Sequence, residues 1–247
     1  MEREPDATPS TAATRLPADA EHPVAATVVL MRDGVDGVEV LLLERPHHRG
    51  SFAGAWVFPG GGVDDEDRLE SDPPDIVEET LARRSAVREV REETGLELAN
   101  ESLVTAACWT PPAEAPRRFR TWFYWAVAPA GDIVIPPEEI VDHTWIRPAL
   151  ALERHAAGKL MLVPPTWVTL FDLAQFDSVD AALAAVRAVE TQNFVTQVGS
   201  NENGMVLYWH GDEAHAGAHA ADGQLESTGG RHRLEVGILP WVYSRSV

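Results

Sequence analysis

The feature that most constrains this chain is a charged segment, REVREETGL, at positions 88–96. On a helix, Glu89 lies three residues before Glu92 and four before Glu93, so the three carboxylates project from neighbouring points on one face. Like charges at this spacing repel one another, and a bound Mg²⁺ or Mn²⁺ ion relieves the repulsion by accepting carboxylate oxygens as ligands. Gly95 is the residue type expected just past a helix end. The segment therefore predicts a helix that can bind a divalent metal.

The charges of this helix also allow a second interpretation. A solvated helix face would carry the same glutamates, paired with Arg88 and Arg91. A different side of the helix carries Val87, Val90 and Thr94, which can anchor the helix to a sheet. The helix alone leaves both a metal site and a salt-bridged surface open.

Residues upstream of the helix favour the metal site. The loop FPGG at 58–61 comes first and REVREETGL at 88–96 follows. In this order they resemble the two halves of the signature of the Nudix hydrolase family. In the second half, Arg-Glu is followed by an aliphatic residue, any residue, Glu-Glu, any residue, Gly and an aliphatic residue. The resemblance implies an α/β (α+β) fold, the Nudix α/β/α sandwich with a mixed central sheet.

The spacing between the two halves departs from the family pattern. The family places a glutamate six residues after the glycine at Gly61, where this chain has Asp67, and the Arg-Glu pair eight residues later. Arg88 comes much further along the chain, so we expect an insertion at about 68–75. The helix-stabilising glutamate of the family then corresponds to Glu79 or to Asp67.

The resemblance also implies roles for individual residues. Glu89, Glu92 and Glu93 would be ligands of Mg²⁺ or Mn²⁺, and the carbonyl of Gly60 a further ligand. Arg88 would orient a carboxylate. A bound metal ion neutralises a diphosphate and activates a water for in-line attack, while glycine lets the backbone approach a phosphate without a Cβ clash. The resemblance thus predicts a metal-dependent diphosphate hydrolase.

A general base is expected from the loop before the last strand of the sheet, where the chain offers Glu138, Glu139 and Asp142. Family members commonly supply an acid from this stage of the chain, and we choose Glu139. Acidic residues after a Pro-Pro pair are also typical of solvated turns. With Arg88 and Glu92, Glu139 completes the expected catalytic set.

Two arginine-bearing segments bear on the substrate. Residues 42–61 partly follow the longer pattern of the coenzyme A diphosphatases within the family, including the peroxisomal enzymes, although the expected threonine is missing. The segment PRRFR at 116–120 resembles a run of the same subset, with arginine in place of its aspartate. Guanidinium groups match phosphate geometry, so the expected substrate-binding residues are Arg45, Arg49, Arg117 and Arg118. Surface solubility is the alternative role for each arginine.

The expected substrate is coenzyme A or acyl-coenzyme A, which would give 3′,5′-ADP and (acyl-)phosphopantetheine. ADP-ribose, a dinucleotide or another nucleoside diphosphate derivative is the close alternative. A catalytically silent regulator that binds a nucleotide is also open, because a fold alone does not guarantee chemistry. The intact glutamate set argues against a silent binder.

The charge balance limits the partners. The formal charge is -19, from 39 acidic and 20 basic residues, and this field disfavours nucleic acid and anionic membranes. No apolar run is long enough to span a bilayer, and a single cysteine, Cys108, cannot form an internal disulfide. We therefore expect a cytoplasmic enzyme with a small nucleotide-derived substrate, and a homodimer is left open.

The expected organisation is a disordered tail at 1–21 and a single domain at 22–247, with a C-terminal extension from about 160. A late hairpin is expected after Phe194. Apolar runs and turn residues predict strands at 24–31, 38–43, 103–109, 120–128 and 144–146, and helices at 76–94, 149–155, 165–176 and 179–189.

Overall fold

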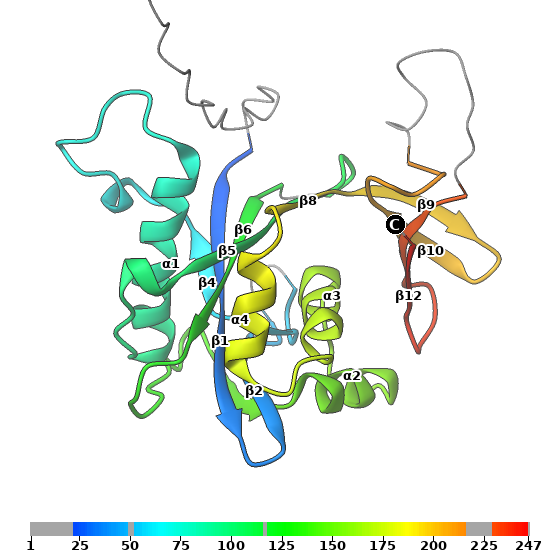
Figure 1. Cartoon of the computed structure of the whole chain (residues 1–247), viewed down its shortest axis with the longest axis horizontal. Coiled ribbons are helices and arrows are strands. Elements are labelled where there is room, and N and C mark those ends of the chain that lie inside the picture. The colour runs from blue at the N-terminus through cyan, green and yellow to red at the C-terminus, as the bar shows by residue number, and fades with distance from the viewer. Residues whose placement is uncertain (1–21, 49–51, 116–117, 216–228, 247) are drawn as a thin grey trace, which may run out of the picture.

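The computed structural model describes residues 22–48, 52–115, 118–215 and 229–246. The tail expected at 1–21 lies outside these residues. The described part contains an eight-stranded sheet with helices on both faces and a separate four-stranded sheet beside it (Figure 1).

The large sheet is mixed, as predicted. Its strand order is β3-β2-β1-β6-β5-β8, with β4 paired to β1 and β7 paired to β2. The long strand β1 is antiparallel to β2 and β4 but parallel to β6. The strands are β1 (Val24–Gly34), β2 (Gly37–Glu44), β3 (Trp56–Val57), β4 (Gly60–Gly62), β5 (Val104–Thr110), β6 (Arg120–Val127), β7 (Asp142–Ile146) and β8 (Gln192–Val195).

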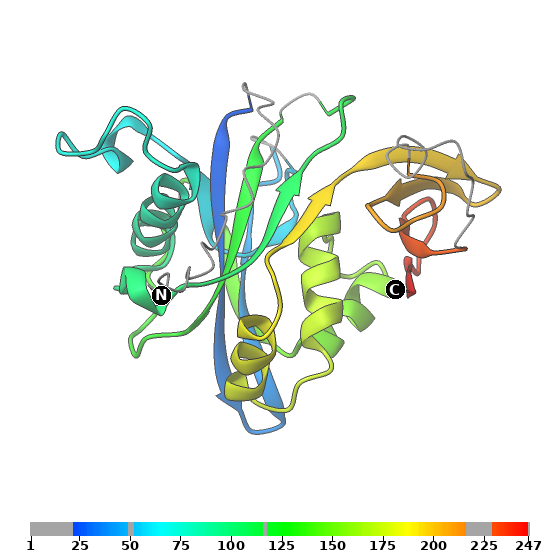
Figure 2. The same cartoon turned by 45° about the horizontal axis from the view of Figure 1, so that its top comes forward.

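Side chains of β1 alternate between two cores. Val28 and Leu30 pack in the core that contains Val90 of α1, whereas Val29 and Met31 belong to the core on the opposite face. Helix α1 lies on one side of the sheet and the other helices lie on the opposite side (Figure 2). The predicted sandwich is therefore confirmed. The helices are α1 (Glu78–Thr94), α2 (Pro148–Ala156), α3 (Pro164–Leu173) and α4 (Val179–Arg187).

Helix α1 ends where the sequence predicts, because Gly95 adopts a left-handed φ of 73° and its N–H caps the helix. The segment between the glycine loop and α1 begins with a 3-10 helix, η1 (Asp65–Asp67), and continues through turns. Arg84 of α1 holds these turns by two hydrogen bonds to Asp72, of 2.5 and 2.9 Å.

The C-terminal region differs from the single hairpin expected after Phe194. It forms four antiparallel strands in the order β12-β11-β10-β9, namely β9 (Gln197–Asn201), β10 (Gly204–Tyr208), β11 (Arg231–Glu235) and β12 (Val242–Ser246). Phe194 of β8 stacks on Trp109 of β5 at 3.8 Å, and Trp209 packs edge-on against both rings. This aromatic cluster joins the small sheet to the main core.

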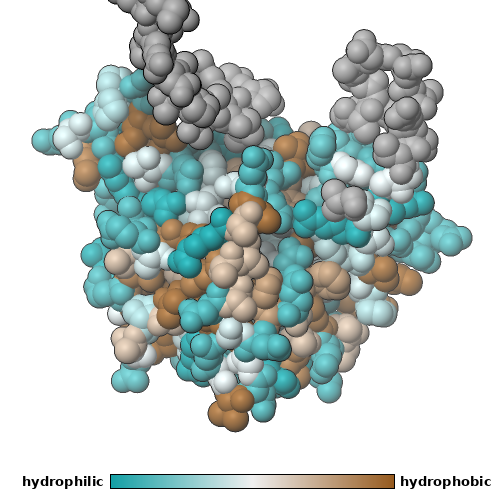
Figure 3. Space-filling model, in the orientation of Figure 1, coloured by the Kyte–Doolittle hydropathy of each residue, from teal (hydrophilic) through white to brown (hydrophobic). Residues whose placement is uncertain are grey.

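The surface is mixed in character. The face in Figure 3 carries many hydrophilic residues, and a light-brown strip lies over α4, where Ala181 and Ala184 are exposed. Among the helices that the structure describes, none has the length and apolar character to cross a membrane.

Candidate active site

The glycine loop forms strand β4, which lies between β1 and the C-terminal half of α1. A Cβ atom on Gly60 would lie 2.2 Å from the carbonyl oxygen of Ala26, and a Cβ on Gly61 would lie 2.3 Å from Oε1 of Glu89. Real Cβ atoms do not approach other atoms this closely. Only glycine therefore allows the Glu89 carboxylate to lie against the loop.

Glu93 is tied directly to the same loop. The backbone N–H of Gly60 donates a 2.8 Å hydrogen bond to Oε2 of Glu93, whose residue is 7% exposed. Burial raises the pKa of Glu93 to about 8. The negative charges of Glu89 and Glu139 contribute to this rise, while the hydrogen bond from Gly60 and the charge of Arg45 oppose it. In the metal-free protein the Glu93 carboxyl is therefore harder to ionise than an exposed glutamate.

The pKa of Glu89 is also affected by the neighbouring carboxylates. Burial raises its pKa, Arg88 opposes the rise, and the charges of Glu92 and Glu139 add to it. Carboxylates that raise one another's pKa lie close together and lack enough positive charge to balance them. The helix face predicted from the sequence therefore exists, and the loop acid Glu139 belongs to the same cluster.

Arg88 is the centre of a hydrogen-bond network beneath this cluster. Its Nε and Nη2 atoms donate to the two carboxylate oxygens of buried Asp67 at 3.1 and 3.0 Å, and Nη2 also donates to the carbonyl of Gly62 at 2.9 Å. Its Nη1 atom donates to Glu89 at 2.8 Å and to Glu92 at 3.0 Å. Arg88 therefore hydrogen-bonds the carboxylates of Asp67, Glu89 and Glu92 at once.

The structure decides between the two acids left open as the helix-stabilising residue. Asp67, the last residue of η1, pairs with Arg88. Glu79 instead accepts hydrogen bonds from Arg83 at 3.1 Å and from the hydroxyl of Thr105 at 2.6 Å. Of the two acids, Asp67 is therefore the one that pairs with Arg88.

Divalent metal fits this site by its chemistry. Three acidic side chains of α1 and one from the loop before β7 supply hard oxygen atoms, which Mg²⁺ and Mn²⁺ prefer. In the described parts of the chain, no three His, Cys, Asp or Glu side chains already converge as ligands. Arg88 instead bridges Glu89 and Glu92 through Nη1. The raised pKa values of Glu89 and Glu93, caused by burial and by neighbouring negative charges, are the observation that favours a cation at this site.

Glu139 lies in an exposed turn, where its backbone N–H donates to the carbonyl of Pro136 at 3.0 Å. Its negative charge contributes to the raised pKa of both Glu89 and Glu93. Asp142 starts β7 and is exposed, and its side chain accepts a hydrogen bond from the backbone N–H of His143 at 2.8 Å. Glu139 is therefore the loop acid whose charge contributes to the raised pKa values of Glu89 and Glu93.

Of the expected phosphate-binding arginines, the structure describes Arg45 and Arg118, which have different surroundings. Arg45 acts electrostatically on Glu93, and its Nε atom is buried without a hydrogen-bond partner in the described structure. Arg49 and Arg117 lie outside the described residues. Arg118 lines a pocket together with Arg120, which pairs with Glu78 at the start of α1. Glu78 and Glu93 are fifteen residues apart on α1, a distance of about 22 Å.

One buried polar residue of the site was not predicted. The hydroxyl of Ser85, which is fully buried, donates a 3.0 Å hydrogen bond to the carbonyl of Gly62. Ser85 precedes Arg88 by three residues, so both side chains lie on one helix face and bind the same carbonyl. That spacing is the signal in the sequence that could have identified it.

Comparison with known proteins gives a family and a fold. The family model described as the NUDIX domain matches residues 21–164. The crystal structure of a NUDIX hydrolase from Alicyclobacillus acidocaldarius is similar, with a TM-score of 0.58 and 23% identity over 68% of this chain and 97% of that chain. The NUDIX domain of Shewanella oneidensis NrtR, complexed with ADP ribose, has a TM-score of 0.48 and 18% identity over 72% of this chain and 96% of that chain. Among curated proteins, a search finds no match.

Proposed function

The chain belongs to the NUDIX domain family and is a Nudix hydrolase, and on this premise we propose that it hydrolyses the diphosphate linkage of a nucleoside diphosphate derivative with Mg²⁺ or Mn²⁺. The observation that carries the proposal is that Glu89 and Glu93 lie against a loop in which only glycine fits, with the charges of Glu92 and Glu139 acting on Glu89. A cluster of this kind is costly to a protein that does not neutralise it.

The side chains have distinct tasks in this proposal. Glu89, Glu92 and Glu93 hold the metal with the carbonyl of Gly60, and the ion supplies charge neutralisation of the diphosphate and activation of a water. Glu139 accepts a proton from the attacking water as the general base. Arg88 is a positioning residue, because its hydrogen bonds fix the carboxylates of Glu89 and Glu92.

Arg45 is proposed to bind a phosphate group of the substrate. Its charge lowers the pKa of Glu93, and its Nε atom has no hydrogen-bond partner in the described structure. A guanidinium in this situation gains a strong, charge-assisted hydrogen bond when an anion arrives. Coenzyme A or acyl-coenzyme A is the substrate we propose, on the resemblance of residues 42–61 and 116–120 to the coenzyme A diphosphatases.

Product analysis tests both the proposed reaction and the proposed substrate. The purified chain is incubated with Mg²⁺ or Mn²⁺ and either coenzyme A, a short acyl-coenzyme A, ADP-ribose or NADH, and Glu93→Gln is the inactive control. Formation of 3′,5′-ADP by the wild type alone supports the coenzyme A substrate. If AMP forms from ADP-ribose or NADH and coenzyme A is not cleaved, diphosphate hydrolysis is supported and coenzyme A is rejected as the substrate. No turnover of any compound would favour a silent nucleotide binder.

A further inference from the structure

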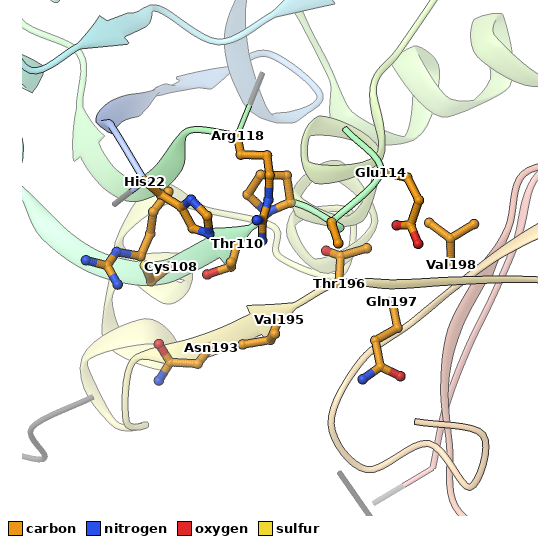
Figure 4. Close-up of a pocket in the computed structure, with 13 residues that line it drawn as sticks. His22, Cys108, Thr110, Glu114, Arg118, Asn193, Val195, Thr196, Gln197 and Val198 are labelled. Carbon is orange, nitrogen blue, oxygen red and sulfur yellow. The ribbon is translucent and has the colours of Figure 1, made fainter. Parts of the chain in front are cut away.

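A pocket of about 480 Å³ lies at the N-terminal end of α1, on the part of the sheet formed by β5 and β8. Its walls come from His22 before β1, from Cys108 and Thr110 of β5, from Pro111, Ala113, Glu114 and Arg118 between β5 and β6, and from the chain around β8 (Figure 4). Segments far apart in the sequence thus enclose one space. Its volume is within the range of about 300–1,000 Å³ typical of small-molecule sites.

The pocket contains an unbalanced cation. Arg118 lines it, and the Nε atom of Arg118 is buried without a hydrogen-bond partner in the described structure. The neighbouring Arg120 differs, because its Nε atom donates to Glu78 at 2.8 Å and its charge is neutralised there. A buried donor without a partner is costly, so Arg118 is suited to an anionic ligand.

The surroundings of Arg118 match a phosphate group. Figure 4 shows the side chains of Arg118, His22 and Thr110 turned toward the same part of the pocket. Glu114, the acidic residue of the lining, lies on the other side of the space, near Val198. Burial raises the pKa of the Cys108 thiol to about 12, so the pocket wall carries no thiolate that would repel an anion.

The rest of the lining is suited to an uncharged body. Pro111, Val195 and Val198 supply apolar surface, and the side chain of Asn193 adds an amide. Such a wall accommodates a sugar or a base attached to the phosphate. The volume exceeds that needed for a phosphate group alone.

We propose that this pocket is a second binding site, which takes a small phosphate monoester, separate from the carboxylate cluster that cleaves the diphosphate. Its position supports the separation, because Arg120 of the pocket pairs with the first residue of α1, about 22 Å along the helix from Glu93. The proposal does not depend on which diphosphate the enzyme hydrolyses.

Calorimetric titration of the full chain tests the site. The buffer contains EDTA and no divalent cation, and the probes are AMP, ribose 5-phosphate and the uncharged adenosine. We expect AMP and ribose 5-phosphate to bind at one site per chain and adenosine to bind at least tenfold more weakly, because Arg118 contributes through the phosphate. Failure of both phosphate esters to bind would overturn the proposal, as would equal affinities for AMP and adenosine.

Variants then locate the binding. Arg118→Met removes the charge, and Val195→Phe fills the pocket from an exposed position of β8. Each should weaken AMP binding about tenfold or more. Arg147→Met, at an exposed arginine before α2, is the matched control and should leave the affinity unchanged. Thermal melting confirms that each variant is folded.

A last arm separates this site from the catalytic one. Glu93→Gln should bind AMP with wild-type affinity, because Glu93 lies at the other end of α1. Loss of AMP binding in Glu93→Gln, with binding retained in Arg118→Met and Val195→Phe, would place the probe at the carboxylate cluster and reject the second site. These experiments measure binding and not hydrolysis. If the second site is rejected, the proposed hydrolysis of a diphosphate is unaffected.

Discussion

Arg88 holds Asp67 through two hydrogen bonds, one of 3.1 Å from Nε to Oδ1 and one of 3.0 Å from Nη2 to Oδ2. Asp67 is 4% exposed, and the pair joins the 3-10 helix after the glycine loop to the helix that carries the site's glutamates. The inserted turns follow Asp67, so this ion pair keeps loop and helix together in spite of the extra residues.

Breaking this pair should destabilise the protein. Asp67→Asn removes the buried negative charge that pairs with Arg88. We expect the free energy of unfolding to fall by about 3 kcal/mol. Glu89 and Glu92 still bind Arg88, which keeps the loss at the lower end for a buried pair. Asp65→Asn, an exposed position in the same 3-10 helix, should change stability by less than about 0.5 kcal/mol. Urea denaturation measures both, and equal losses would refute the role of the pair.

The glycine loop offers a matched pair of substitutions. Gly61→Ala places a Cβ atom 2.3 Å from Oε1 of Glu89, so the carboxylate must move, whereas a Cβ on Gly62 comes no closer than 3.5 Å to Phe119. We expect Gly61→Ala to lower kcat about 100-fold by displacing a metal ligand, and Gly62→Ala to retain most activity. Similar rates for the two variants would show that the approach of Glu89 to the loop does not matter for catalysis.

Stability of the metal-free protein should depend on pH. Burial raises the pKa of Glu93 to about 8, above its ordinary value of 4.5, so the folded state binds a proton that the unfolded state releases between these values. The stabilisation is complete below about pH 4.5 and is lost as the pH rises toward 8. In EDTA, Tm should therefore fall between pH 5 and 8, and Glu93→Gln should flatten this part of the curve. An unchanged slope in Glu93→Gln would show that other groups cause the dependence.

Arg45 should act on substrate binding more than on folding. Removing its guanidinium in Arg45→Gln should raise KM about tenfold for the diphosphate that is turned over, because a charge-assisted hydrogen bond to phosphate is lost. Arg147→Gln, at an exposed arginine, is the control. Steady-state kinetics separates the two parameters, and a wild-type KM for Arg45→Gln would remove this residue from the substrate site.

The family resemblance implied the sandwich, and local sequence patterns predicted the end of α1 at Gly95. The spacing of Glu89, Glu92 and Glu93 fixes their common helix face, and glycine limits where the helix can continue. These features depend on neighbours within a few residues, so the sequence alone was sufficient for them.

Features that depend on contacts between residues distant in the sequence could not be predicted from local patterns. The insertion left Asp67 and Glu79 both open as the helix-stabilising acid. Only the fold shows that Asp67 pairs with Arg88, whereas Glu79 binds Arg83 and Thr105. The four short C-terminal strands pair across long connections, which leave no local period to recognise. The different surroundings of Arg45 and Arg118 have the same origin, because the local sequence does not show which part of the sheet each arginine will lie beside.

The most direct test of the central claim is hydrolysis of nucleoside diphosphate derivatives, followed by phosphorus NMR, for the wild type and Glu93→Gln with and without Mg²⁺. We predict that the wild type cleaves the diphosphate only with the metal, and that Glu93→Gln is folded but at least about 100-fold slower. Cleavage at the wild-type rate by Glu93→Gln, or by the wild type in EDTA, would contradict the assignment of the carboxylate cluster as the metal-dependent site.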